Sequence, residues 1–231
     1  MDDDQSQIRQ PIAFEYWSDP LCIWAFVSEP RLQGVLRDRA ELLRVTHRLV
    51  VVFGSVPWRF REGPWVEPGP AGRAVATRTI AQRFGRDDVT GQVWTDDAPA
   101  SSWAPAAAIK AAFAQEAAQE SATGSAEAYQ CALRDAFFVD NRNIARRRVQ
   151  LEVAEALGLR VADLEQRLDD GAALAAVWED QRRKDERYIQ GSPTYVFDDG
   201  RALLYGNVAP GILEHTVDEL LRGLNPGGSR C

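Results

Sequence analysis

The stretch DPLCIWAF, residues 19–26, carries a cysteine shortly after an Asp-Pro pair. This pair favours a helix start, with Asp19 as the N-cap and Pro20 at the first helical position. A thiol in the first turn of that helix, at Cys22, faces unpaired backbone N–H groups and the positive end of the helix dipole, which lower its pKa. We therefore predict that Cys22 is a nucleophile able to attack a disulfide or an electrophilic carbon.

Ala25 stands where a dithiol redox site would carry its second cysteine. A cysteine there would lie one turn from Cys22 on the same face and would resolve a mixed disulfide, which alanine cannot do. Three uses of Cys22 stay open. It works with a low-molecular-weight thiol, as in a monothiol reductase; it adds reversibly to an unsaturated substrate in an isomerisation or transfer; or it is a relic, a small hydrophobe in a protein that only binds.

The elements around this thiol follow from residue type and periodicity. The aromatic-rich segment 12–17 is a strand, 21–39 is a helix that Pro30 should kink or divide, and 42–53 is a second, buried strand. Residues 54–72 are rich in Gly, Pro and Trp and should form a long irregular connection that serves a site. The thiol thus lies in the first loop of a β-α-β unit.

The remainder of the chain is first helical and then returns to strands. Residues 73–187 are dominated by Ala-rich amphipathic segments, the clearest being 101–119, 126–139, 144–158 and 161–187. A β-hairpin is predicted at 191–206 with its turn at Asp199-Gly200. A helix at 210–223 follows, so the order is β-α-β, a helical block, then β-β-α.

Two motifs make this order resemble the DsbA-like thioredoxin-fold family. YWSDPLCIW (16–24) is similar to the family's strand–D-P-x-C-P-W-C–helix active site, and GSPTYVF (191–197) is similar to its cis-proline loop. AFFVDNRNI (136–144) resembles the FrnE-like branch, which is related to kappa-class glutathione transferases and 2-hydroxychromene-2-carboxylate isomerases. The sequence departs from the redox pattern at Ile23, which replaces proline, and at Ala25.

The resemblance implies an α/β class protein, a thioredoxin fold with a large all-helical insertion. The thioredoxin-like domain would comprise residues 12–63 and 188–224, and the inserted helical domain residues 64–187. It also implies that the Ser192-Pro193 bond is cis and faces Cys22. The backbone of Ser192 would then make a strand-like contact with a substrate or thiol cofactor.

Further candidate residues surround these motifs. We assign substrate or thiol-cofactor binding to Trp17, Asp19, Ile23, Trp24, His47, Ser192 and Pro193, and catalysis to Cys22. The many other tryptophans favour an aromatic-lined pocket for a flat, mostly apolar ligand, as in tailoring of a polycyclic metabolite, although each could equally pack in the core; they include Trp58, Trp65, Trp94 and Trp103.

Two histidines and a cluster of arginines have competing interpretations. His47 is either a core or sheet-end histidine or an acid/base beside Cys22, and His215 should be at the surface. The arginines are either a solvated helix face or a site for carboxylates of a thiol cofactor or acidic substrate; they are Arg142, Arg146, Arg147 and Arg148. Cys131 should lie in the core.

Composition excludes several classes of protein. The net charge of −7 argues against nucleic-acid binding, and no apolar run approaches the roughly 18 residues of a membrane span. The acidic N-terminus lacks the features of a signal peptide and, like the C-terminal NPGGSRC, should be disordered. Three widely separated cysteines form neither a disulfide framework nor a metal-ligand spacing. We expect a cytoplasmic protein without a metal.

These inferences converge on an intracellular thiol-dependent enzyme with one active-site cysteine. It would act as a monothiol oxidoreductase, transferase or isomerase on a small aromatic or polyketide-like metabolite of secondary metabolism. No cofactor would be tightly bound; glutathione or mycothiol is the candidate second thiol. The alternative is a degenerate DsbA-like protein that binds a ligand or partner without redox catalysis. Members of the resembled families often dimerise, so a homodimer stays open.

Overall fold

The computed structural model describes residues 10–222 of the 231-residue chain. The two tails that the sequence predicts to be disordered, together with Cys231, lie outside the described residues. None of the helices in the described part of the chain is long and apolar enough to cross a membrane.

A four-stranded mixed sheet forms the centre of the fold. Its strands are β1 (Ile12–Ser18), β2 (Leu43–Leu49), β3 (Thr194–Phe197) and β4 (Ala202–Tyr205), in the order β2-β1-β3-β4. β1 and β2 are parallel, whereas β3 runs antiparallel to both β1 and β4. With a large helical insertion between β2 and β3, this is the α/β thioredoxin-like arrangement that was predicted.

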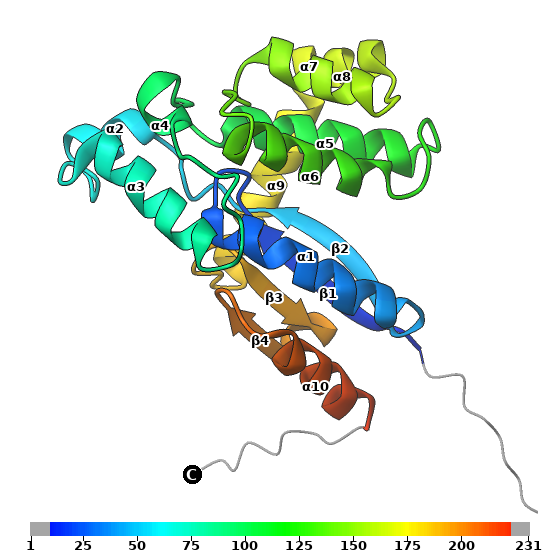
Figure 1. Cartoon of the computed structure of the whole chain (residues 1–231). Coiled ribbons are helices and arrows are strands. Elements are labelled where there is room, and N and C mark those ends of the chain that lie inside the picture. The colour runs from blue at the N-terminus through cyan, green and yellow to red at the C-terminus, as the bar shows by residue number, and fades with distance from the viewer. Residues whose placement is uncertain (1–9, 223–231) are drawn as a thin grey trace, which may run out of the picture.

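One face of the sheet is covered by α1 (Ile23–Asp38) and α10 (Pro210–Leu221) (Figure 1). Both helices are amphipathic, and their apolar faces bury the aromatic face of the sheet. The cluster includes Leu32, Val35, Leu213, Val217, Phe14, Tyr16, Tyr195 and Phe197. The first helix therefore holds its N-terminal end at a fixed place beside the ends of β1 and β3.

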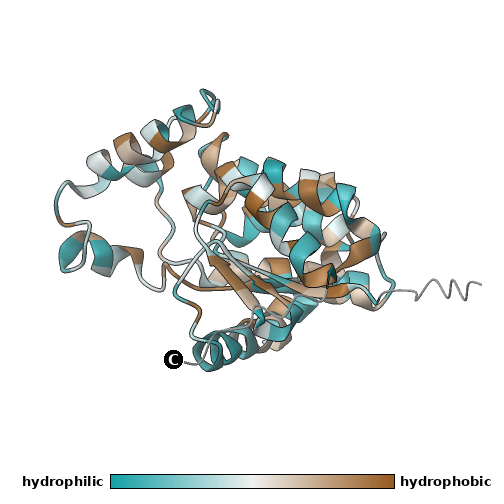
Figure 2. Ribbon diagram, turned by 90° about the horizontal axis from the view of Figure 1, so that it is seen from below, coloured by the Kyte–Doolittle hydropathy of each residue, from teal (hydrophilic) through white to brown (hydrophobic). Residues whose placement is uncertain are grey.

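The insertion contains seven helices before α9 (Ala172–Glu186). They are α2 (Val56–Arg61), α3 (Gly69–Gln82), α4 (Val93–Asp96), α5 (Trp103–Ala117), α6 (Ser125–Phe138), α7 (Arg147–Ala156) and α8 (Val161–Asp169). Figure 1 shows α5–α8 gathered beyond β2, on the side of the sheet opposite α10. In Figure 2 the long helices carry both hydrophilic and hydrophobic residues, and the small alanines of α5 are buried between α6, α8 and α9.

The start of α1 differs from the prediction. The helix begins at Ile23 with Cys22 as its N-cap, so the predicted N-cap role of Asp19 is wrong. The N–H of Cys22 donates to the Asp19 carbonyl at 3.1 Å, and the N–H of Leu21 donates to the Asp19 carboxylate at 2.7 Å. Residues 19–22 form this turn because the carboxylate is also bound by segments far along the chain.

Pro30 does not divide α1, which runs continuously from Ile23 to Asp38. Proline removes one backbone hydrogen bond from a helix interior, the one to the carbonyl four residues earlier. Pro30 lies on the exposed side of the helix, whereas Phe26, Val27 and Leu32 are buried. The packing of these neighbours keeps the helix in one piece despite the lost bond.

The segment after β2 is more regular than the sequence predicts. The strand ends at Leu49 rather than at residue 53, and α2 and the first turn of α3 lie within the predicted irregular connection 54–72. Ser55 caps α2 by accepting a hydrogen bond from the N–H of Trp58 at 3.2 Å, a helix start that the Gly- and Pro-rich composition concealed. The prediction of an irregular connection is therefore wrong for these residues.

Candidate functional site

Cys22 lies against the loop that precedes β3. Its Sγ donates a hydrogen bond to the carbonyl oxygen of Ser192 at 3.3 Å. The Ser192-Pro193 peptide bond is cis, as predicted. The two motifs, 170 residues apart in sequence, thus meet at one point of the fold, and the thiol faces the backbone that could bind an extended substrate or thiol cofactor.

Asp19 links the Cys22 turn by hydrogen bonds to the segment after β2, to Ser102 and to the cis-proline loop. Its carboxylate accepts hydrogen bonds from the N–H groups of Val52 and Phe53 at 2.7 and 3.2 Å and from the hydroxyl of Ser102 at 2.7 Å. Its own N–H donates to the Ser192 hydroxyl at 2.9 Å. Burial raises the pKa of Asp19 to about 6 despite these hydrogen bonds. Burial lowers the pKa of Arg59, and the charge of Asp19 acts in the opposite direction, although no cation within residues 10–222 lies at ion-pair distance from Asp19.

The pKa of Cys22 is raised, which corrects the prediction of a lowered value. Burial of the thiol is the largest cause, and only 6% of the residue is exposed. The Ser192 side chain and the backbone N–H groups of Trp24 and Ala25 act in the opposite direction, as expected for a helix N-terminus, but they do not outweigh burial. A charged partner in the pocket is therefore needed to favour the thiolate.

A cavity of about 240 Å³ opens beside the thiol. Cys22, Ile23 and Trp24 line one side, and Ser192 lines the side of the cis-proline loop; Val52, Phe53, Arg59, Trp65, Arg73, Gln190, Gly191 and Tyr205 complete it. Trp24 is 38% exposed and packs edge-on against Phe84. The predicted aromatic lining is present at Trp24 and Trp65, whereas Trp58, Trp94 and Trp103 do not line this cavity.

Two arginines in this cavity were not predicted. Arg73 lies 4.4 Å from the ring centroid of Trp65 and 5.2 Å from that of Trp94. Arg59 lies over Phe53 and Trp65, and it donates a hydrogen bond to the carbonyl of Val52 at 2.5 Å. Within residues 10–222 neither guanidinium has a carboxylate within ion-pair distance.

The charge of Arg73 is coupled to that of the thiol. Burial lowers the pKa of Arg73 to about 10, while an ionised Cys22 raises it. The two groups therefore attract each other when both are charged. Arg73 is the cation that can offset the burial of a Cys22 thiolate, or bind an anionic group brought in by a ligand.

Other candidate residues lie apart from this cavity. Trp17 is buried against Val50 and Val196, and its indole N–H donates to Glu15 at 3.1 Å. His47 lines a different and larger cavity beside β2. The structure thus brings Ile23, Trp24, Ser192 and Asp19 to the thiol or its loop, and it separates Trp17 and His47 from it.

The arginine cluster and the second cysteine are also distant from Cys22. Each arginine has an acidic partner: Arg142 and Arg148 pair with Glu152, Arg146 with Asp97, and Arg147 with Asp169. Arg142 and Arg146 precede α7, and Arg147 and Arg148 lie in its first turn, so these paired arginines form a solvated surface and not the single helix face that was predicted. Cys131 is half-buried on α6, and its sulfur accepts a hydrogen bond from Gln33 at 3.1 Å. His215 is at the surface, as predicted.

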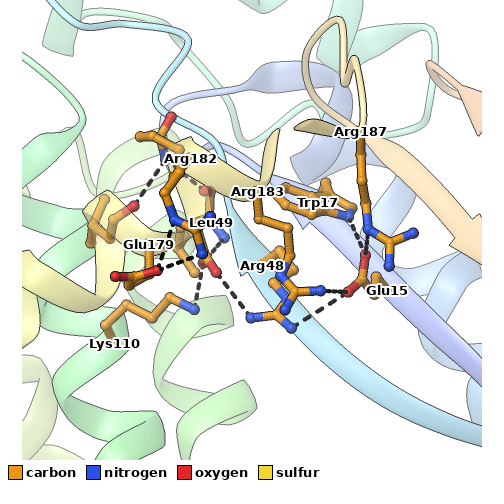
Figure 3. A network of polar contacts seen from close by, with 12 residues as sticks. Glu15, Trp17, Arg48, Leu49, Lys110, Glu179, Arg182, Arg183 and Arg187 are labelled. Carbon is orange, nitrogen blue, oxygen red and sulfur yellow. Dashed lines mark hydrogen bonds and ion pairs between the residues drawn. The ribbon is translucent and has the colours of Figure 1, made fainter. Parts of the chain in front are cut away.

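Asp180 organises a second polar centre, shown in Figure 3. Its carboxylate forms ion pairs with Lys110 and with Arg48 and accepts the N–H of Leu49 at 2.7 Å. Arg48 also contacts Glu15 at 3.4 Å, so the network joins β1, β2, α5 and α9. Within residues 10–222 no group of three or more acidic, His or Cys side chains is placed to hold a metal ion.

Several known proteins are similar to this chain. The ClpXP adapter protein SpxH of Halalkalibacterium halodurans is 28% identical over 201 residues, which cover 85% of this chain and 61% of that protein. The chain therefore spans less than two thirds of the length of this curated relative.

Two solved structures share the fold. The cytosolic disulfide reductase DsbM from Pseudomonas aeruginosa is 24% identical with a TM-score of 0.67, covering 91% of this chain and 98% of that one. A second similar structure is DsbM with GSH. A 2-hydroxychromene-2-carboxylate isomerase is 19% identical with a TM-score of 0.62, covering 91% and 97%. A family model described as the DSBA-like thioredoxin domain matches residues 14–218. The chain belongs to the family of DSBA-like thioredoxin domains.

Proposed function

We propose that this protein is a thiol-dependent enzyme that uses Cys22 as its only nucleophile, together with a small thiol of the glutathione type. The observation that carries the proposal is the placement of the Cys22 Sγ 3.3 Å from the carbonyl oxygen of Ser192, next to a cis peptide bond. The N–H of Ser192 makes no hydrogen bond within residues 10–222, so it is available to pair with the peptide part of a small thiol, which brings its sulfur to Cys22.

The chemistry of such a site is a two-step thiol–disulfide exchange. The Cys22 thiolate attacks one sulfur of a substrate disulfide; the S–S bond breaks, a new S–S bond forms to Cys22, and the second sulfur leaves as a thiolate. The thiolate of the small thiol then attacks the substrate sulfur of this mixed disulfide and releases Cys22. Ala25 cannot perform the second attack, which is why an external thiol is required.

The two unpaired arginines favour an anionic partner. Glutathione carries two carboxylates, and a guanidinium binds a carboxylate through two parallel hydrogen bonds. Arg59 and Arg73 lie in the Cys22 cavity among aromatic rings. A structure of the similar reductase DsbM with GSH is consistent with this choice, and a cytoplasmic location would provide the reduced small thiol.

The first experiment measures a mixed disulfide at Cys22. The reduced protein is incubated with oxidised glutathione, and intact-protein and peptide mass spectrometry locate the adduct. We expect one glutathionyl group on Cys22, its absence in Cys22→Ser, and its release by reduced glutathione. Cys131→Ser is the matched control and should keep the adduct. No adduct on Cys22 under these conditions would overturn the proposal.

A restored dithiol tests the geometry of the site. In Ala25→Cys the new thiol lies one helical turn from Cys22 and should form a disulfide with it under mild oxidant. This variant should also shed glutathione from Cys22 without added thiol, because the new cysteine attacks the mixed disulfide. If no intramolecular disulfide forms, then Cys22 is not at the position that the family motif gives its nucleophile.

An isomerase or transferase reaction on a small aromatic metabolite uses the same residues. Here the Cys22 thiolate, or a bound small thiol, adds to a conjugated double bond, rotation follows, and the sulfur is expelled. The cavity is walled by Trp24, Phe53 and Trp65, and the fold is shared with an isomerase. Retained turnover of an unsaturated carboxylate by Cys22→Ser would identify the bound thiol as the nucleophile, with Cys22 only positioning it.

The second candidate function is binding of a partner without redox catalysis. It is favoured by the missing resolving cysteine at position 25 and by the similarity to a protein named as a ClpXP adapter. Under this hypothesis Cys22→Ser binds its partner as well as the unchanged protein does. Absence of any glutathione adduct combined with unchanged partner binding would favour this function over the enzyme.

A further inference from the structure

β2 is an edge strand, and one side of its backbone faces away from the sheet. The N–H of Val50, directly after the strand, donates to Ser18 of β1, whereas the N–H of Leu49 points the other way and donates to Asp180. Backbone groups of successive strand residues alternate in direction. The outward groups of β2 therefore belong to Leu43, Val45, His47 and Leu49.

Only one end of this edge is covered by α9. There the carboxylate of Asp180 accepts from Leu49, and the side chain of Gln181 accepts from the N–H of Val51 at 2.9 Å and donates to the carbonyl of Leu49 at 2.9 Å. Figure 3 shows Leu49 and Lys110 in one half of the polar network and Glu15 at its other end. These contacts satisfy the backbone from Leu49 onward.

The other end of the edge opens into a cavity with a volume of about 1140 Å³. Val45 and His47 line it, and its walls come from the second half of α1 and from the α5–α6 pair, including Leu36 and Phe113. Among residues 10–222 no hydrogen bond reaches the backbone N–H or C=O groups of Val45 or His47 on this side. Such a row of groups is a template for another strand.

The cavity wall carries an acidic charge without a full partner. Glu127 lies 4.0 Å from His47, but burial lowers the pKa of His47 to about 4, so the histidine is neutral at physiological pH. Burial and the nearby carboxylates Glu29 and Glu116 raise the pKa of Glu127. Of the basic wall residues, Arg48 and Lys110 are neutralised by Glu15 and Asp180, and the exposed Arg37 lies 3.8 Å from Asp38. A cation entering here would relieve the repulsion.

We infer that the edge of β2 from Leu43 to His47 is a docking site for an extended segment of a partner protein that places a Lys or Arg side chain against Glu127. The segment adds a fifth strand to the sheet through the outward groups of Val45 and His47. Main-chain hydrogen bonds supply affinity in this mode, and side chains at alternate positions supply specificity. The net charge of −7 also favours a basic partner.

An extended backbone fits this site better than other occupants. Outward groups recur every second residue, about 6.6 Å apart at roughly 3.3 Å per residue, which matches a strand and not a helix with its internally satisfied backbone. The cavity lies on a different part of the molecule from Cys22, with no lining residue in common. Docking is therefore independent of the thiol chemistry proposed above.

The test selects binders from a library of short random peptides with the full chain as bait. Hydrogen exchange then measures protection of the Val45 and His47 amides by each selected peptide. We expect selected peptides to carry a basic residue and to protect both amides. Failure to enrich any peptide, or protection confined to another part of the chain, would overturn the inference.

Two variants and a control sharpen this result. Val45→Pro removes an outward N–H while leaving the ladder to β1 intact, since proline is tolerated on the open side of an edge strand; peptide affinity should fall at least tenfold. Glu127→Gln keeps the shape of the side chain and should weaken binding by several-fold, in a salt-sensitive way. Glu155→Gln, at an exposed site on α7, should change nothing. Thermal melts verify that each variant is folded.

Two further outcomes of these experiments would contradict docking of a partner segment at the edge of β2. If sedimentation shows a dimer that Val45→Pro converts to a monomer, the edge pairs with a second copy of this chain, and the partner-segment inference is wrong. Peptide binding that is unchanged in both Val45→Pro and Glu127→Gln is equally incompatible with it. Cys22→Ser should bind the selected peptides normally, so failure of this inference and failure of the proposed enzyme are distinguishable.

Discussion

Asp19 and Asp180 are both buried carboxylates that hold the chain between residues 49 and 53, but only one of them is neutralised. Asp180 binds the N–H of Leu49 and pairs with Arg48 and Lys110. Asp19 binds the N–H groups of Val52 and Phe53 and a serine hydroxyl, with no ion pair in the described part of the chain. Asp180 lies where the sheet contacts the helical insertion, and Asp19 lies at the Cys22 site.

The presence or absence of an ion pair distinguishes the structural role of Asp180 from the place of Asp19 at the candidate functional site. A buried charge with partners rigidifies the elements it joins, although the pair itself adds little net stability. A buried charge without a counter-ion costs free energy and persists where function requires it. Around Cys22 the unpaired groups have both signs: the carboxylate of Asp19 and the guanidinium of Arg73. The Cys22 site therefore holds buried charges of both signs without ion-pair partners in residues 10–222, which is consistent with the proposed charged ligand.

Removing the paired carboxylate should have the largest effect on stability. In Asp180→Ala two half-buried cations and the Leu49 N–H lose their partner, which costs about 3–5 kcal/mol for a buried pair broken on one side. Urea denaturation measures the loss of unfolding free energy. Glu179→Ala, next to it in an exposed pair with Arg182, is the control and should cost less than about 1 kcal/mol. Equal effects of the two would remove the distinction between the regions.

The unpaired carboxylate should instead produce a pH dependence. The pKa of Asp19 is raised from 3.8 to about 6 in the folded protein. Between these values the folded state binds more protons, so the contribution of Asp19 to stability is complete below about pH 4 and is lost as the pH rises through 6. Two pKa units correspond to about 3 kcal/mol.

The measurement is the difference in unfolding free energy between the unchanged protein and Asp19→Asn at several pH values. This difference should become less favourable to the unchanged protein by about 3 kcal/mol from pH 4 to 7. His47, whose lowered pKa acts with the opposite sign over the same range, is present in both proteins and cancels. A difference that does not vary with pH would show that Asp19 has a counter-ion in solution.

Arg73→Leu should affect ligand chemistry more than stability. Removing a buried cation without a carboxylate partner relieves a desolvation cost, so the free energy of unfolding should stay the same or rise. Formation of the glutathione adduct on Cys22 should fall at least tenfold, or about 1.4 kcal/mol. The exposed Arg83 on the C-terminal end of α3 offers the control Arg83→Leu, which should form the adduct normally. A large loss of stability in Arg73→Leu would make this arginine part of the scaffold.

The sequence predicted the local features of this site better than its electrostatics. The position of Cys22 before a helix, and the cis bond at Ser192-Pro193, follow from short motifs that carry their own geometry. The raised pKa of Cys22 does not, because burial depends on segments that meet only in the fold. Helix-end N–H groups act on Cys22 in the predicted direction and are outweighed.

Arg73 and His47 also show that a sequence pattern does not predict which residues become neighbours in the fold. Arg73 carries no motif, and its importance arises because Trp65 and Trp94 surround it in space; an arginine following a Trp- and Pro-rich segment was the only signal. His47 is in phase with Val45, Leu49 and Val51, as predicted, but only Leu49 of these is buried, and a strand pattern does not say which cavity a side chain faces. Its neighbours, Phe113 and Glu127, come from helices that the sequence places elsewhere.

The smallest effect on stability and on adduct formation is expected for an ion pair that is exposed to solvent. Arg147 and Asp169 lie 2.7 Å apart with side chains 40% and 66% exposed, and exposed pairs contribute about 0–1 kcal/mol. Arg147→Ala should therefore lower the unfolding free energy by less than about 1 kcal/mol and leave the glutathione adduct on Cys22 unchanged. A strong loss of the adduct would instead assign this arginine cluster, and not Arg73, to the carboxylates of the small thiol. Comparing adduct formation in Arg147→Ala and Arg73→Leu shows which arginine binds the small thiol: one in a dense cluster of ion-paired arginines, or one without an acidic partner.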